Sequence, residues 1–346
     1  MDRASIYLSQ KNTQVLKGIA ILLLLCHHYW YTGEGYNDFW MYGFPLFKSI
    51  GAIGKLCVTL FVFLSGYGLS VRTIQNKGVI RVLPFYRKRF VKLMMNYWLI
   101  WLLFVPIGVF VFNRTFIDVY GDHYIVPSIV DFFGLFLAVF NHPYGYNATW
   151  WFYSCIIVLY LLFPLIWKLR SLGFMLIPLA LLIPELCAIP YVINSRALSL
   201  IFSYLLPFVC GILFAYTKTL RFQVTGMGKF MSIIVMILLC CTYRMHSSYT
   251  VLWETIICAW GVFLYKQNSH VRIISDALSF LGRHSFNIFL FHTFIYLYYF
   301  HNLVFWSSNP IVIFLTLLAV CIIISIFIEF LKTVLKFDRL QLILTK

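Results

Sequence analysis

Long apolar stretches separated by short polar connections run through most of this chain, and the pattern predicts membrane-spanning helices. A spanning helix needs about 20 mostly apolar residues. Such stretches lie near residues 14–33, 50–71, 92–112, 150–168, 172–190, 197–217, 229–244, 249–266, 278–300 and 310–332. They are continuous rather than alternating, which disfavours a β-barrel. We therefore predict an all-α, polytopic membrane helical bundle of about ten transmembrane helices, forming a single domain over residues 1–346.

Composition supports the same class of protein. Apolar residues make up 62% of the chain and charged residues only 11%, whereas an average soluble domain carries about 25% charged residues. This is too little charge to cover the surface of a soluble globule. The nine cysteines form no C-x-x-C pair, so we predict neither a metal site nor a disulfide framework.

The excess of basic residues has a topological explanation. The chain holds 27 Lys and Arg against 11 Asp and Glu, and basic residues accumulate in cytoplasmic loops. Ten spans with both termini in the cytoplasm leave only five basic residues outside: Lys48, Lys55, Arg114, Arg196 and Arg244. The same charge in a soluble protein would suggest nucleic-acid binding. Here the orientation of the spans in the membrane accounts for the charge, and we predict no nucleic-acid partner.

The stretch 125–141 is apolar but short, and it carries Asp131. An eleventh span at this position would move every later loop to the opposite side of the membrane. The basic residues would then no longer be concentrated on the cytoplasmic side. We therefore predict that 125–141 is an interfacial or re-entrant segment on the outer face.

Ionisable residues inside the first predicted span indicate a functional site, because such residues are costly in a bilayer. Lys17 and His28 are eleven residues apart. At 100° per residue they share one helix face, about 16 Å apart along the axis. The same register selects His28 over His27. The alternative is that Lys17 snorkels to the inner headgroups while both histidines cap the outer interface.

Two further regions carry candidate chemistry. The predicted inner loop at 72–92 holds seven basic residues and no acidic one, which suits either an anionic ligand or anionic lipid headgroups. The ninth predicted span carries Ser285, Asn287 and His292. A buried histidine bonded to a neighbouring helix is the competing interpretation there. Glu254 and Glu329 are the acidic residues inside spans that are available as partners.

Five segments together resemble one known family. They are Lys17 to His28 (a basic residue, ten residues, then histidine), Phe-Val-Phe-Leu-Ser-Gly-Tyr at 61–67, Arg-Lys-Arg leading to Asn-Tyr-Trp within 87–98, Trp-Phe through Tyr-Leu-Leu-Phe-Pro within 151–164, and Leu-Gly-Arg-His-Ser-Phe through His292 within 281–292. This order resembles the integral-membrane acyltransferase 3 family, in the stand-alone form without an SGNH domain. The chain departs from the family pattern in having Lys17 rather than Arg, and Met95-Asn96 where a proline is frequent.

The resemblance implies a membrane O-acyltransferase that moves an acyl group, foremost acetyl, from cytoplasmic acyl-CoA to a hydroxyl of a cell-surface or capsular polysaccharide or its precursor. It implies a multi-pass protein of a bacterial plasma membrane, in contact with membrane lipids, and no metal. The resemblance implies catalytic roles for His28, His292 and Ser65, and binding of acyl-CoA by Lys17, Arg87 and Arg89. It implies that the acceptor substrate is bound by Trp150, Trp151, Tyr153 and Asn287. His28 is expected to act as general base or to accept the acyl group itself.

Several alternatives stay open. A membrane transporter or flippase for a polysaccharide or another anionic substrate would also place His, Lys and Glu in spans. The acyl group could be succinyl instead of acetyl, and the acceptor could be a lipid-linked intermediate, a peptide or a small molecule. The sequence predicts no particular oligomeric state.

Overall fold

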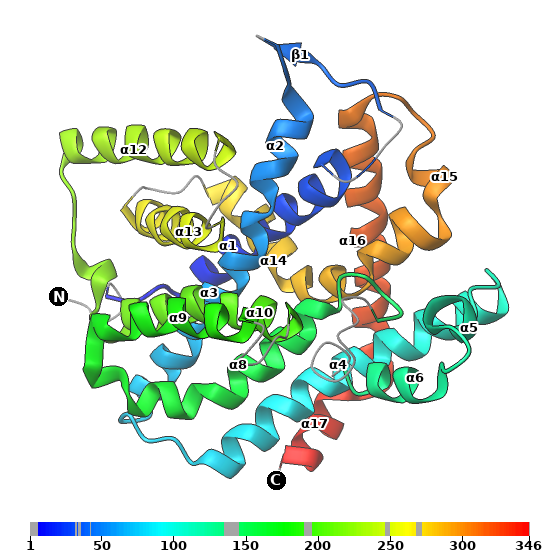
Figure 1. The fold of residues 1–346 in the computed structure, drawn as a ribbon, viewed down its shortest axis with the longest axis horizontal. Helices are drawn as coiled ribbons and strands as arrows, with labels where there is room; N and C mark the ends of the chain where they lie inside the picture. Colours follow the sequence, from blue (N-terminus) through cyan, green and yellow to red (C-terminus); the bar gives the residue numbers. More distant parts are fainter. Residues whose placement is uncertain are drawn as a thin grey trace. The chain divides into compact units, whose positions relative to one another are not determined.

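The structure is a computed structural model (Figure 1) that describes residues 6–345 except 32, 34–35, 42, 135–144, 190–195, 246–249 and 268–271. The side chains of residues 196–197 and 244–245 also lie outside the description. The described residues are almost entirely helical, and the only strands among them pair Trp40 with Pro45 and Met41 with Phe44.

The elements run in chain order as α1 (Gln10–Cys26), the π-helix η2 (His27–Tyr31), β1 (Trp40–Met41), β2 (Phe44–Pro45), α2 (Leu46–Gly54), α3 (Leu56–Gln75), α4 (Val82–Phe110), α5 (Phe116–Tyr120), α6 (Ile125–Phe132), α8 (Trp151–Lys168), the 3₁₀-helix η3 (Arg170–Met175), α9 (Leu176–Ala188), α10 (Arg196–Ser203), α11 (Leu205–Tyr216), the 3₁₀-helix η4 (Thr219–Arg221), α12 (Gly226–Met245), α13 (Thr250–Gln267), α14 (Arg272–Thr293), the π-helix η5 (Phe294–Tyr299), α15 (His301–Val304), α16 (Pro310–Val334) and α17 (Phe337–Thr345).

Seven helical stretches of the described chain are long and apolar enough to cross a membrane: Leu46–Gln75, Val82–Phe110, Trp151–Lys168, Arg170–Ala188, Leu198–Tyr216, Gly226–Tyr243 and Pro310–Val334. They confirm the all-α membrane architecture. The other three predicted spans also coincide with helices, namely α1 with η2, α13, and α14 with η5. The count of ten and the sides of the termini stay predictions.

Two of these three helices, α1 and α14, fall short for local reasons. The α-helical part of α1 stops at Cys26 after 17 residues, and α14 carries Arg272, Asp276 and Arg283 within its length.

The segment 125–141 is described up to residue 134 and contains α6, which has eight residues. At 1.5 Å per residue, α6 is only about 12 Å long and is too short to cross.

The described chain divides into two compact units. Unit 1 comprises residues 1–79, 165–182 and 203–285, and unit 2 comprises residues 80–164, 183–202 and 286–346. The helices α8, α9 and α14 each begin in one unit and end in the other. The single domain of the sequence analysis stays a prediction.

Glycines bring helix backbones of unit 1 into direct contact. A side chain at Gly66 of α3 would overlap the carbonyl oxygen of Phe208 on α11, and one at Gly211 of α11 would overlap the carbonyl oxygen of Phe63. Small residues at such crossings let helices approach closely enough for continuous van der Waals contact. Gly66 lies inside the Leu-Ser-Gly-Tyr motif, so that motif has a packing role.

A second reciprocal contact joins α1 to α14. A side chain at Gly18 would overlap the carbonyl oxygen of Leu278, and one at Gly282 would overlap that of Gln14. Both glycines belong to the family-like segments. Around these crossings lies an apolar cluster that includes Leu16, Leu60, Phe63 and Ile257.

Aromatic rings form the centre of unit 2. The Tyr97 ring of α4 stacks on Tyr153 with centroids 4.5 Å apart, and it meets Trp150 edge-on at 4.8 Å. Further along α4, the Phe104 ring stacks on Phe291 at 5.5 Å and on Phe294 at 5.1 Å. Such pairs add to the burial of apolar area and join α4 to α8, α14 and η5.

We expect Gly66→Leu to destabilise unit 1, because the new side chain has backbone atoms in its place, and overpacking of this kind costs about 1–3 kcal/mol or more. Gly68→Leu is the matched control, since Gly68 is an exposed position of the same helix with open space around it. Thermal unfolding of both purified variants in detergent measures the effect. Equal unfolding temperatures would contradict the α3–α11 contact.

Candidate active site

The end of α1 carries the two adjacent histidines. The helix begins behind Ser9, whose side chain accepts a hydrogen bond from the backbone N–H of Asn12, and it is α-helical up to Cys26. From His27 to Tyr31 the backbone is a π-helix, a rare form that is frequent at functional sites. The 100° register used to select His28 therefore holds only up to Cys26. His27 and His28 lie in the π-helix, where each turn of the helix is wider.

His27 has a defined tautomer. Its Nδ1 lies 3.0 Å from the carbonyl oxygen of Gly51 on α2. Because a carbonyl only accepts, Nδ1 donates the proton, and Nε2 of the neutral ring keeps its lone pair. The ring stacks on Tyr31 with centroids 5.3 Å apart and meets the His28 ring edge-on at 5.3 Å. Both histidines are half-buried.

The other predicted site residues of unit 1 are also half-buried on packed helices. Lys17 precedes Gly18 on α1, and Ser65 precedes Gly66 on α3. The two helices α1 and α3 pack against each other. The Tyr67 hydroxyl accepts the backbone N–H of Leu8 at 3.0 Å, so this tyrosine fixes the segment before α1. The glycine contacts thus place both motifs at helix crossings.

The predicted site residues of unit 2 are mostly buried and bonded. His292 is fully buried, and its Nδ1 donates to the carbonyls of Ile288 and Phe289 at 3.0 Å each. The Trp150 indole donates to the Leu290 carbonyl at 2.8 Å, and the Tyr153 hydroxyl donates to the sulfur of Met94 at 3.2 Å. Among the predicted aromatic residues, Trp151 keeps a half-exposed ring.

Asn287 ties α14 to α16. Its amide nitrogen donates to Glu329 at 2.7 Å and to Ser325 at 3.1 Å. Its amide oxygen accepts from Lys332 at 2.8 Å, and Lys332 also pairs with Glu329 at 2.8 Å. This network uses both ends of the Asn287 amide.

Arg87 and Arg89 lie in the first turns of α4 rather than in a loop. Two residues apart on an α-helix means about 200° around its axis, so the two side chains leave opposite sides. The exposed Arg87 donates from Nε to the carbonyl of Leu344 in α17 at 2.9 Å. The half-buried Arg89 lies over the Phe85 ring at 5.8 Å.

The predicted residues therefore divide between the units. Unit 1 holds His28, Lys17 and Ser65, and unit 2 holds the rest. Their convergence on one catalytic site stays a prediction. Within the described ranges, no group of three His, Cys, Asp or Glu side chains is placed to hold a metal ion.

Glu254 of α13 is a buried acid with a complete set of partners. Its carboxylate accepts from Thr59 at 2.6 Å and Tyr243 at 3.0 Å, and Lys55 lies 3.6 Å away. The sequence analysis marked this residue because an acid within a span needs a partner. Lys55 lies at the junction of α2 and α3, and sequence spacing did not indicate that it pairs with Glu254.

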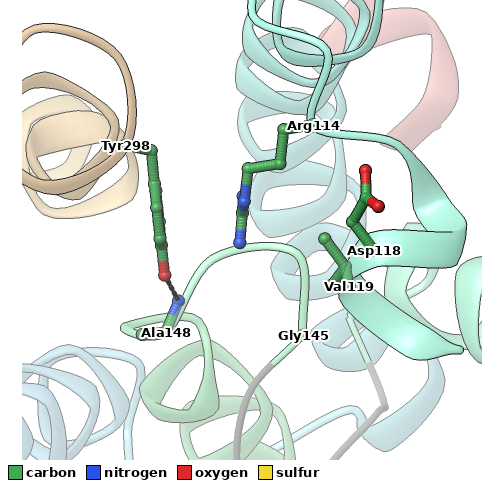
Figure 2. A pocket seen from close by; sticks show the side chains of 6 residues that line it. All are labelled: Arg114, Asp118, Val119, Gly145, Ala148 and Tyr298. Atoms are coloured by element: carbon green, nitrogen blue, oxygen red, sulfur yellow. Dashed lines mark hydrogen bonds between the residues drawn. The ribbon is translucent and has the colours of Figure 1, made fainter.

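A pocket of about 330 Å³ opens in unit 2, lined by Arg114, Asp118, Val119, Gly145, Ala148 and Tyr298 (Figure 2). Sequence analysis singled out none of these residues individually. The one available signal was Arg114, a cation on the predicted outer side, where basic residues are disfavoured.

Asp131 anchors the chain beside this pocket. The carboxylate is fully buried and accepts from the Tyr120 hydroxyl at 2.8 Å and from the backbone N–H of Tyr146 at 3.2 Å. The Tyr97 hydroxyl donates to the backbone carbonyl of Asp131 at 2.6 Å. Burial raises the pKa of Asp131 to about 6, and the hydrogen bonds from Tyr120 and Tyr146 limit the rise.

The fold and these helices define an integral-membrane protein with ionisable groups on packed helices. The family model of the acyltransferase 3 family, described as an acyltransferase domain, matches residues 12–330. The match covers nearly the whole chain, and the chain belongs to this family, which confirms the resemblance seen in the sequence. Comparison with curated proteins gave no match, and comparison with solved structures gave none. The protein is therefore a membrane acyltransferase.

We expect Asp131 to make stability depend on pH. A carboxyl whose folded pKa lies above its unfolded value of about 3.9 is better protonated in the folded state. The free energy of unfolding should therefore rise as the pH falls from about 6 to about 4, by up to about 3 kcal/mol. Asp131→Asn should remove this slope, while Asp122→Asn, a change at an exposed acid of the same segment, should keep it. If the unfolding temperatures of wild type and Asp131→Asn change with pH in parallel, Asp131 is not the cause of the pH dependence of stability.

Proposed function

We propose that this acyltransferase moves an acetyl group from cytoplasmic acetyl-CoA to a hydroxyl of a cell-surface or capsular polysaccharide, or its precursor, at the plasma membrane of a bacterium. The observation that carries the proposal is the family match over residues 12–330, which includes the Lys17–His28 motif on α1 and η2. The half-buried setting of His28, at the point where the α-helix opens into a π-helix, is compatible with a reactive imidazole.

In the proposed reaction, His28 takes the proton of the acceptor hydroxyl while that oxygen attacks the thioester carbonyl. The tetrahedral intermediate then collapses, the carbon–sulfur bond breaks, and the CoA thiolate leaves with the proton from His28. An imidazole is suited to both transfers because its ordinary pKa lies near 6.5. In the two-step version, His28 attacks the thioester first and passes the acetyl group to the hydroxyl.

The remaining residues have supporting roles in the proposal. Ser65 holds the thioester oxyanion or orients His28. His292 donates from Nδ1 to backbone carbonyls, so its Nε2 is an acceptor and its proposed role is to orient His28. Lys17, Arg87 and Arg89 bind the phosphates of acetyl-CoA, for which guanidinium forks are suited. Trp150, Trp151, Tyr153 and Asn287 form the acceptor side. Trp151 is the strongest candidate there for stacking on a sugar, because it is only partly buried, whereas Trp150 and Tyr153 are buried.

A complementation experiment tests the proposal. A strain that lacks the gene should lose O-acetyl groups from its surface polysaccharide, measured by the acetyl methyl signal in proton NMR. Wild type should restore the signal and His28→Ala should not, although it inserts at the same level. His27→Ala should retain a measurable part of the signal. Full restoration by His28→Ala, or unchanged acetylation after deletion, would overturn the proposal.

Donor binding, measured on the same purified proteins, separates binding from chemistry. His28→Ala should bind acetyl-CoA with the affinity of wild type. The double variant Arg87→Ala with Arg89→Ala should bind about tenfold more weakly, because it loses charge-assisted hydrogen bonds. Arg221→Ala, a change at another arginine of the predicted inner side, is the matched control. Unchanged affinity in the double variant would show that the basic residues at the start of α4 do not bind acetyl-CoA and only orient the chain in the membrane.

A further inference from the structure

The pocket in unit 2 contains a cation that lies close to two aromatic rings. The guanidinium carbon of Arg114 lies 3.8 Å from the centre of the Tyr298 ring and 4.4 Å from the centre of the Tyr146 ring. Such stacking fixes the plane of a guanidinium and shields its faces from water. The N–H donors point outward from the edge of the guanidinium, where a further partner can bind.

Only part of that edge is used by the described chain. A terminal N–H of Arg114 donates to the carbonyl oxygen of Tyr146 at 2.6 Å, and the Tyr146 hydroxyl donates back to the carbonyl of Arg114 at 2.6 Å. A guanidinium has five N–H donors. Among the described residues, no carboxylate lies within ion-pair distance of Arg114. The arrangement leaves an oriented cation with donors available for a carboxylate.

The opposite wall of the pocket carries a fixed negative charge. Asp118 caps the start of α5, where its carboxylate accepts from the backbone N–H of Thr115 at 2.8 Å and from the Thr115 hydroxyl at 2.7 Å. These bonds lower the pKa of Asp118, so the group is ionised at neutral pH. Figure 2 shows the Arg114 side chain between Tyr298 on one side and Asp118 with Val119 on the other.

This charge pattern selects a class of ligand. A carboxylate fits the edge of Arg114, and hydroxyl groups can donate to Asp118. Asp118 would repel a group with two negative charges, such as phosphate, more strongly than a single carboxylate. The volume of about 330 Å³ is at the lower end of the range for small-molecule sites, about 300–1,000 Å³, which suits a single sugar ring.

We infer that this pocket binds a uronic-acid unit of the acceptor polysaccharide, with its carboxylate on Arg114 and a hydroxyl on Asp118. The inference rests on the proposed function for the identity of the acceptor. It adds that the acceptor is acidic, and it gives Arg114 a reason to lie on the predicted outer side, where topology disfavours arginine.

Binding of small glycosides to the full chain in nanodiscs, without acetyl-CoA, tests the inference. Methyl glucuronide should bind at least about tenfold more tightly than methyl glucoside, because only the former forms charge-assisted bonds to Arg114. Arg114→Gln should abolish this preference. Lys48→Gln, a change at an exposed cation of the predicted outer side, should keep it. Inorganic phosphate should compete poorly.

Arg114→Lys covers the case in which Arg114→Gln fails to fold. Lysine keeps the charge but lacks the planar fork, so the preference should drop at least about fivefold. Equal binding of the two glycosides to wild type, or competition by phosphate as strong as by glucuronide, would overturn the inference.

The measurement is independent of acyl transfer. A glucuronide preference in a protein that transfers no acetyl group would contradict the proposed function and leave the pocket assignment standing. Acetyl transfer to polysaccharide without a glucuronide preference would contradict the pocket assignment alone.

Discussion

Contact between helix backbones at glycines is the constraint on which unit 1 depends. In a bilayer, lipid tails are as apolar as the side chains, so burial of apolar area contributes little to helix association and close van der Waals packing contributes most. Gly18 with Gly282, and Gly66 with Gly211, each let one helix reach the carbonyl oxygens of another. Because Lys17 and Ser65 directly precede two of these glycines, the crossings also set where the candidate site residues lie.

Charge is the second constraint, since ionised groups within spans are costly unless they are paired. Two acids within spans have a lysine of their own unit as a partner: Glu254 has Lys55 and Glu329 has Lys332. Hydroxyl and amide groups complete both sets. These two networks are best explained as helix cross-links.

Helix positions could be predicted from the sequence because apolar stretches of spanning length leave few other structures open to a chain. The role of the motif glycines could not be predicted, because a glycine in a sequence does not show which backbone it touches. The π-helix at His27 was missed, since a uniform 100° register was assumed to continue beyond Cys26. Asn287 could be singled out as a polar residue in a span, but its bonds to Glu329 and Lys332 depend on how α14 and α16 pack. The pocket at Arg114 was missed because its residues come from three separate segments.

The proposed function has its donor in the cytoplasm and its acceptor at the cell surface, so it requires that the acetyl group crosses the membrane through this chain. Membrane vesicles of known orientation, supplied with radiolabelled acetyl-CoA that does not cross the bilayer, test it most directly. Inside-out vesicles, which present the cytoplasmic face to the donor, should label polysaccharide enclosed in their lumen, and sealed right-side-out vesicles should not. Equal labelling in both orientations, or labelling only in right-side-out vesicles, would contradict the claim.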